Sequence, residues 1–171
     1  MPEQGMLQGI AVRSARRAPM QERQQVDVTV EQGIVDDYRG AGLRQVTFLS
    51  VQQWRETLQE LGVELPWHTR RANLLIEGID LPEVVGQQLQ IGDCLFTIYG
   101  ETEPCQRMEE LQRGLQYALK PDLRAGVWGK VVRGGSLQLG QCVQVLPSAA
   151  AITSAPPGVS VLSRSIGRDQ S

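Results

Sequence analysis

The chain has few of the residues that form disulfide frameworks and zinc sites. Its 171 residues include three widely spaced cysteines and a single histidine. An odd cysteine count without a C-x-x-C pair argues against a disulfide framework and predicts a reducing compartment, the cytoplasm. One histidine also leaves too few ligands for a zinc site of the usual cysteine–histidine type.

An excess of one charge and long apolar runs are absent as well. The 17 Lys and Arg residues stand against 19 Asp and Glu residues, so neither a nucleic acid nor a membrane is expected as the main partner. No apolar run approaches the ~20 residues that cross a bilayer, and residues 1–10 lack the features of a secretory signal. The common nucleotide-binding and G-x-S-x-G hydrolase fingerprints are also missing.

Short segments with strand patterns make up most of the sequence. They are rich in β-branched residues and are separated by polar or glycine-rich runs: residues 7–13, 26–30, 44–50, 73–79, 95–101, 126–134 and 141–146. Around the fifth segment, Cys94, Phe96 and Ile98 fall on one face, as a half-buried strand requires. Many short strands predict a mainly β (α+β) fold, a β-barrel with a few short helices.

Two helices are predicted among these strands. Ser50 with Gln53 three residues later forms a capping-box pattern, an apolar stripe follows, and Gly62 is suited to end the helix. A second helix is expected over 104–115, because proline favours the first helical turn. Its buried stripe would consist of Met108, Leu111 and Leu115.

Composition divides the chain into three parts. Residues 148–171 are dominated by Ala, Ser, Pro and Gly without a hydrophobic period, which predicts a disordered tail. Residues 1–8 are expected to be a flexible N-terminus. The folded domain is therefore predicted to span 9–147.

Cys105 is the first candidate for chemistry. Following Pro104, it would lie in the first turn of the second helix, where unpaired amides and the helix dipole stabilise a thiolate. A thiolate is both a nucleophile and a soft metal ligand. The alternative is an inert surface cysteine. Cys94 and Cys142 fall inside strand patterns, where packing is the expected role.

Two further clusters have the composition of binding sites. Arg70 and Arg71 precede a strand that opens with Asn73; guanidiniums suit a phosphate, and an amide suits a heterocycle. The alternative is an ordinary solvated basic turn. In residues 33–50, Asp37 and Arg39 belong to a glycine-containing run that forms either a binding loop or a plain turn.

The order of these clusters resembles that of the MOSC domain, a family named after the C-terminal part of molybdenum-cofactor sulfurases. "GIVDDYRG" leads to "RQVTFLSVQQW", then to "RRANLLIEGIDL", "VGQQLQIGDCLFTIYGETEPCQRM" and "GVWGKVVRGGSLQLGQCVQVL". The resemblance covers about residues 9–146 and implies a β-barrel. It also implies that Cys105 carries sulfur as a persulfide or ligates molybdenum, with Arg71 and Asn73 near the pterin phosphate and the metal.

The resemblance further implies molybdenum cofactor as the ligand, and we predict Arg70, Asp37 and Arg39 from their own clusters as additional binding residues. Sulfur would come from a separate pyridoxal phosphate-dependent cysteine desulfurase, because 171 residues cannot hold a fused one. Some relatives are components of molybdenum-dependent reductases of N-hydroxylated compounds, with a redox partner protein. Stand-alone relatives often carry G-D-x-H near the first loop, whereas 36–39 here reads DDYR, which leaves the role of this loop open.

Two other functions fit the same residues. The barrel could be a non-enzymatic module that binds a partner or a small anionic ligand. Alternatively, Cys105 could be a thiol redox sensor, which would require a resolving cysteine within reach.

We expect the tail to be disordered in solution. Its few apolar residues cannot offset a backbone ordering cost of ~1–2 kcal/mol per residue. Backbone NMR relaxation measures this directly. Order parameters near the rigid value of about 0.85 across 150–171 would contradict the prediction.

Overall fold

A computed structural model describes residues 4–38 and 44–147 and confirms a mostly β fold with a few short helices. The strands are β1 (Gln4–Val12), β2 (Gln21–Arg23), β3 (Gln25–Thr29), β4 (Gly33–Ile34), β5 (Val46–Ser50), β6 (Leu74–Glu77), β7 (Gln88–Ile91), β8 (Cys94–Glu101), β9 (Val127–Arg133), β10 (Gly135–Gln138) and β11 (Cys142–Leu146). The α-helices are α1 (Val51–Leu61), α2 (Gln106–Leu111) and α3 (Leu115–Ala118), and the 3-10 turns are η1 (Trp67–Arg70), η2 (Leu81–Val84) and η3 (Pro121–Leu123).

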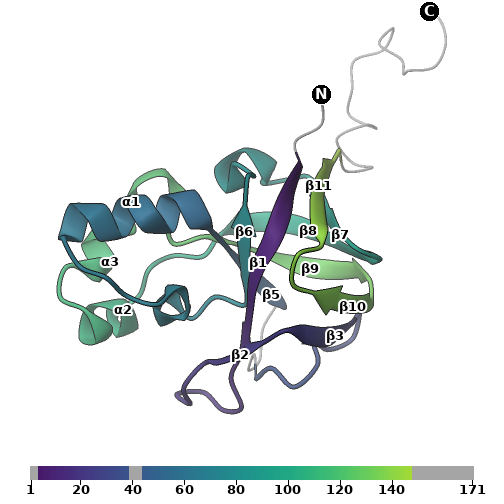
Figure 1. Ribbon diagram of the computed structural model, residues 1–171, viewed down its shortest axis with the longest axis horizontal. Coiled ribbons are helices and arrows are strands. Elements are labelled where there is room, and N and C mark those ends of the chain that lie inside the picture. The colour runs from purple at the N-terminus through teal and green to yellow at the C-terminus, as the bar shows by residue number, and fades with distance from the viewer. Residues whose placement is uncertain (1–3, 39–43, 148–171) are drawn as a thin grey trace, which may run out of the picture.

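Seven strands close into a barrel in the order β11-β7-β8-β9-β5-β6-β1, and the pairing of β1 with β11 completes the ring. β2 pairs antiparallel with the end of β1, and a small separate sheet of β10, β3 and β4 lies beside the barrel. Figure 1 shows the three α-helices together on one side and the small sheet below the barrel. β5 and β6 are the parallel pair, and α1 with η1 forms the crossover that parallel neighbours require.

Helix α1 forms as its sequence predicts. The Ser50 hydroxyl accepts a hydrogen bond from the backbone N–H of Gln53, and Gly62 ends the helix in the left-handed conformation with φ 67°. Val51 and Trp54 are buried on its inner face. Because α1 begins directly after β5, its cap also fixes where β5 stops.

Two apolar cores stabilise the molecule. The larger fills the barrel, where Phe48 and Phe96 meet edge to face at 5.4 Å between ring centroids. Cys94, Phe96 and Ile98 all point into it and are fully buried, which confirms the predicted inward face. The smaller core lies between the barrel and the helices and includes Trp54, Met108, Leu115, Leu119 and Leu49.

The predicted flexible segment over 1–8 is wrong for residues 4–8. They belong to β1, which pairs with β11 from Gln4 to Met6 and with β6 from Met6 onward. Leu7 is fully buried in the barrel core. The polar composition of this segment hid a strand that is stabilised on both edges by neighbours distant in sequence. Residues 1–3 and the predicted tail at 148–171 lie outside the described residues.

The predicted helix over 104–115 is also wrong, because it is two short helices. Gly114, with φ 87°, interrupts the segment and precedes α3. The Glu109 carboxylate accepts hydrogen bonds from the backbone N–H groups of Gly114 and Gln116, at 2.8 and 3.3 Å, and so stabilises the break. As a result Leu111 is exposed, whereas Met108 and Leu115 are buried as expected.

Within residues 4–38 and 44–147, no helix has the length and apolarity needed to cross a membrane.

Gly126 offers a test of how tightly the barrel is built. It has φ 103°, and an added Cβ would overlap the carbonyl oxygen of Phe48. Gly126→Ala should therefore lower the free energy of unfolding by about 3 kcal/mol, from backbone strain plus overpacking. Gly62→Ala is the matched control, because its φ is also positive but its Cβ would meet no atom within 4 Å. Urea denaturation of both variants measures the difference, and equal losses would contradict this account.

Candidate functional site

Connections from distant parts of the sequence enclose one cavity of about 500 Å³ at an edge of the barrel. The strand registers bring the end of β1 and the starts of β5 and β6 to the same edge of the barrel, and the cavity lies there. The segment that follows β8 forms another wall of it. The lining residues are Arg13, Arg16, Arg17, Met20, Asp37, Tyr38, Arg44, Gln45, Thr47, Arg70, Arg71, Asn73, Thr102, Glu103, Cys105, Gln106, Arg107, Met108 and Glu110. The predicted candidates Arg70, Arg71, Asn73, Asp37 and Cys105 therefore share one cavity.

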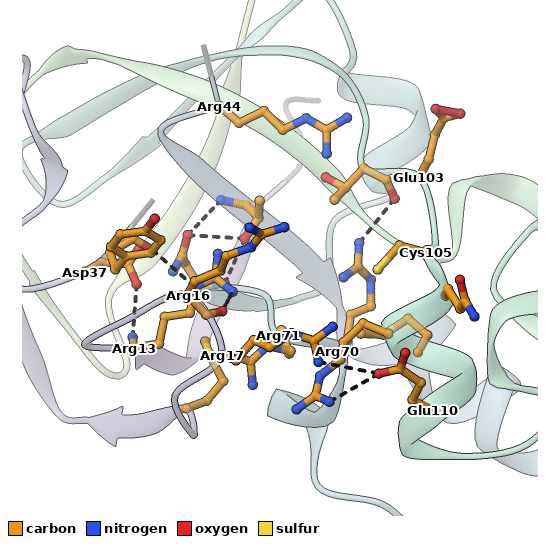
Figure 2. Close-up of a pocket in the computed structure, with 18 of the residues that line it drawn as sticks. Arg13, Arg16, Arg17, Asp37, Arg44, Arg70, Arg71, Glu103, Cys105 and Glu110 are labelled. Carbon is orange, nitrogen blue, oxygen red and sulfur yellow. Dashed lines mark hydrogen bonds and ion pairs between the residues drawn. The ribbon is translucent and has the colours of Figure 1, made fainter. Parts of the chain in front are cut away.

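The lining is strongly basic although the whole chain is slightly acidic. It contains seven arginines against three carboxylates, those of Asp37, Glu103 and Glu110. Figure 2 shows the arginines converging from several segments, with the Cys105 sulfur among them. Such a concentration of guanidiniums attracts an anion and suits bidentate contacts to phosphate or carboxylate oxygens.

Cys105 is exposed and lines the cavity, but it is not in a helical turn as predicted. It is the N-cap of α2, with extended backbone angles of φ −117° and ψ 172°, and its side chain makes no capping hydrogen bond. Helix α2 has six residues, so its dipole is a weak source of positive potential. The arginines that line the cavity supply that potential instead.

Arg70 lines the same cavity as this thiol and is only 6% exposed. Its Nε donates to the Ala125 carbonyl at 2.7 Å and its Nη2 donates to the Thr102 carbonyl at 3.2 Å. Burial lowers the pKa of Arg70 to about 10; Cys105 acts against this shift and Arg44 adds to it. The guanidinium is thus held by backbone carbonyls in a cavity that Cys105 and Arg44 also line.

Arg71 is held in a different way. Its backbone is left-handed, with φ 65°, at the end of η1, and its Nη2 donates to the Ala18 carbonyl at 2.6 Å. Burial lowers the pKa of Arg71, and the neighbouring cations Arg13, Arg107 and Arg17 lower it further. Cys105, which lines the same cavity, opposes this lowering of the pKa.

Asn73 lines the cavity, but most of its hydrogen-bonding capacity serves the sheet. Its Oδ1 accepts from the backbone N–H and the hydroxyl of Thr47, at 3.1 and 3.2 Å, and its Nδ2 donates to the Ala11 carbonyl at 3.1 Å. This amide therefore joins β5, β6 and the end of β1. A ligand would meet at most its remaining N–H.

The first loop contributes Asp37, whose Oδ1 accepts from the backbone N–H of Arg13 at 3.1 Å. Arg13 in turn donates from its Nη1 to the Arg16 carbonyl and from its Nε to the Tyr38 carbonyl. Asp37 thus orders the basic loop after β1 within the described residues. Arg39 lies in the segment 39–43, outside the described residues.

Sequence reasoning missed several residues of the site. The loop after β1 supplies Arg13, Arg16 and Arg17, and the basic run "VRSARRAP" was the available signal. Arg44, Thr102 and Arg107 carry no local signal, because only the fold brings them to the cavity. The buried Thr102 Oγ1 and Arg107 Nε have no hydrogen-bond partner among the described residues.

Metal binding would depend on one protein thiol here. Residues 4–38 and 44–147 contain no group of three or more His, Cys, Asp or Glu side chains that could hold a metal ion. Cys94 is buried, as predicted, and burial raises its pKa to about 11. Cys142 was expected to pack in the core but is exposed, because it faces outward on β11.

A family model described as the MOSC domain matches residues 37–144, which confirms the resemblance inferred from the sequence. No curated protein matches the chain. Among solved structures, the YuaD protein from Bacillus subtilis has a TM-score of 0.71 and 18% identity, covering 86% of this chain and 98% of that one. YiiM from Escherichia coli has a TM-score of 0.66 and 12% identity, covering 84% and 71% of the two chains. YiiM from Geobacillus stearothermophilus has a TM-score of 0.63 and 15% identity, covering 90% and 77%.

The basic surroundings of Cys105 should show in its choice of reagent. We expect the ratio of alkylation rates, iodoacetate over iodoacetamide, to be several-fold higher at Cys105 than at Cys142, because the arginines attract the anionic reagent. The excess should shrink as salt screens the charges. Mass spectrometry of native protein measures both sites together, and the buried Cys94 should react only after unfolding. Equal, salt-independent ratios at the two exposed thiols would contradict the electrostatic account.

Proposed function

Because the chain belongs to the MOSC domain family, we propose that its basic cavity binds molybdenum cofactor through the phosphate, with the metal or sulfur end toward Cys105. The observation that carries the proposal is the convergence of seven arginines and one accessible thiol on a single cavity of about 500 Å³. A cavity of this size suits a small organic ligand. The arginines would bind the phosphate of this ligand, and the thiol would bind its metal or sulfur end.

The donors of the cavity fit such a group. Arg71 and its neighbours Arg13, Arg17 and Arg107 are the residues that would hold the phosphate, because their mutual repulsion is relieved by an anion. The unpartnered Thr102 Oγ1 and Arg107 Nε offer further hydrogen-bonding atoms at the lining. When bound, the cofactor would supply a molybdenum centre capable of two-electron redox chemistry.

Cys105 is the residue proposed to act at the reactive end. As a sulfur carrier, its thiolate would attack the outer sulfur of a persulfide on a separate pyridoxal phosphate-dependent desulfurase, releasing the donor cysteine as a thiolate. As a metal ligand in an oxidoreductase component, the same thiolate would bind molybdenum directly. Reduction of N-hydroxylated compounds, with electrons from a redox partner protein, is the reaction class that the second role suggests.

A second candidate is a non-enzymatic module that binds a small anionic ligand. The observation in its favour is that Asn73 serves mainly the sheet, which leaves the arginines as the principal binding groups. A redox sensor has less support, because neither Cys94 nor Cys142 lines the cavity with Cys105.

Purification from a host that makes molybdenum cofactor tests the proposal. Metal analysis and mass spectrometry should find molybdenum, the pterin, or a persulfide on Cys105 in the isolated protein. Arg71→Ala should weaken cofactor retention by on the order of 2 kcal/mol, the cost of a lost charge-assisted contact. Cys105→Ser should keep the fold and the pterin but lose the metal-bound or sulfur-bound species.

Arg55→Ala is the matched control, because Arg55 is exposed on α1 and does not line the cavity. It should retain the cofactor as the unmodified protein does. Protein that carries neither molybdenum, pterin nor persulfide, but still binds inorganic phosphate, would favour the non-enzymatic module.

A further inference from the structure

The arginines of the cavity form two groups with different neighbours. Arg17 and Arg107 share the carboxylate of Glu110, at 3.6 and 3.4 Å, so the group around Arg71 is partly neutralised. Arg70 and Arg44 act on each other as like charges beside Cys105. Neither forms an ion pair with a carboxylate in the described part of the chain, although Glu103 lines the same cavity.

Both cations of the second group are held in place from outside the cavity. The Arg44 guanidinium lies over the ring of Trp128, 6.0 Å from its centroid, and Trp128 stacks on Tyr99 at 5.2 Å with an interplanar angle of 18°. Arg70 is fixed by its two backbone carbonyls. Figure 2 draws Arg44 above Cys105 and Arg71 below it.

These two arginines keep most of their donors. A guanidinium has five N–H groups. Arg70 uses two of them in its carbonyl contacts, and Arg44 makes no hydrogen bond to another described residue. Arg44 is exposed and Arg70 is buried, but both line the same cavity, and an anion bound between them would accept hydrogen bonds from both guanidiniums and offset their repulsion.

A third group independently indicates a ligand at the same place. Thr102 is 7% exposed and lines the cavity, and its Oγ1 has no hydrogen-bond partner among the described residues. A buried hydroxyl without a partner costs about 1–3 kcal/mol. Since the Thr102 carbonyl is the acceptor for Arg70, the hydroxyl and that guanidinium belong to one arrangement.

We propose that Arg44, Arg70 and Thr102 form a second anion subsite beside Cys105, which binds the oxyanion of a second reactant. This inference rests on the proposed function in one respect: the group around Arg71 takes the phosphate of the cofactor. An oxyanion fits because its oxygens accept from two guanidiniums and a hydroxyl at once. The subsite thereby selects an anionic substrate, either a small free oxyanion or an oxyanion on a larger molecule.

Protection of Cys105 from a neutral reagent tests the subsite in cofactor-free protein. Inorganic phosphate should slow the alkylation of Cys105 by iodoacetamide in a saturable manner, with Cys142 unaffected as the internal reference. Arg44→Gln should raise the phosphate concentration for half-protection about tenfold, and Thr102→Val several-fold, as expected for lost hydrogen bonds to an anion. Arg55→Gln should leave it unchanged.

Two further variants separate this subsite from the cofactor phosphate site. Arg17→Gln should leave protection by phosphate within about twofold, because Arg17 belongs to the other group. Arg44→Lys keeps the charge without the planar fork and should give partial protection. Thermal melts check that each variant is folded. Half-protection concentrations for Arg44→Gln and Arg44→Lys that equal the unmodified value would overturn the proposal.

The source of the oxyanion follows from a comparison of two probes. Equal half-protection concentrations for inorganic phosphate and phenyl phosphate support a small free oxyanion. A half-protection concentration at least fivefold lower for phenyl phosphate supports an oxyanion on a larger substrate. Absence of protection by both probes would overturn the subsite. Cofactor retention is measured on separate protein from a cofactor-producing host. Protein that is isolated without the cofactor, but whose Cys105 is still protected by phosphate, would reject the proposed function alone. Protein that retains the cofactor, but whose Cys105 is not protected by phosphate, would reject the subsite alone.

Discussion

The amide of Asn73 joins three strands that the site depends on. By bonding to Thr47 on β5 and to Ala11 on β1, it fixes both neighbours of β6 at the point where β6 begins. Arg70 and Arg71 directly precede this point, so their direction follows from the same contacts. An apolar residue at this position would leave Thr47 and Ala11 without these partners inside the domain. The cavity is therefore built on a polar seam in an otherwise apolar barrel.

The cavity keeps its positive charge because its arginines bind backbone carbonyls. The carbonyls of Ala18, Ala125 and Thr102 orient Arg71 and Arg70 without cancelling their charge, as a carboxylate would. Carbonyl dipoles offset part of the cost of burying each cation. The exception is Glu110, whose carboxylate pairs with Arg17 and Arg107 and offsets part of the positive charge on that side of the cavity. A protein that is slightly acidic overall thus presents a local field suited to anions.

Most features that depend on contacts between sequence neighbours were predicted from the sequence, whereas several features that depend on contacts between distant residues were not. Strand patterns and the cap of α1 depend on neighbours in sequence, and the seven predicted strands lie within a few residues of β1, β3, β5, β6, β8, β9 and β11. The short strands β2, β4, β7 and β10 were not predicted, because their sequences are polar or rich in glycine and only their pairing partners make them strands. The start of β1 depends on β11 at the other end of the domain, so composition gave no sign of it. The helix break at Gly114 depends on the Glu109 carboxylate, a contact that a helical stripe hides. Motif order predicted Cys105, Arg71 and Asn73 as site residues, and all three line the cavity. Arg44 and Thr102 were not predicted, because only the folded barrel brings them to it.

The closing pair of the barrel has a consequence for how the chain folds. Gln4 on β1 pairs with Gln144 on β11, so the ring is complete only after nearly the whole domain has left the ribosome. At synthesis rates of about 5–20 residues per second, the 140 residues from Gln4 to Gln144 take roughly 7–28 seconds to follow. Pairings of such long sequence separation also slow folding in free solution. Apart from the end that pairs with β2, both edges of β1 are unpaired until β6 emerges, and the edge from Gln4 to Met6 stays open until β11 follows, so the nascent chain exposes strand backbone that other chains can pair with.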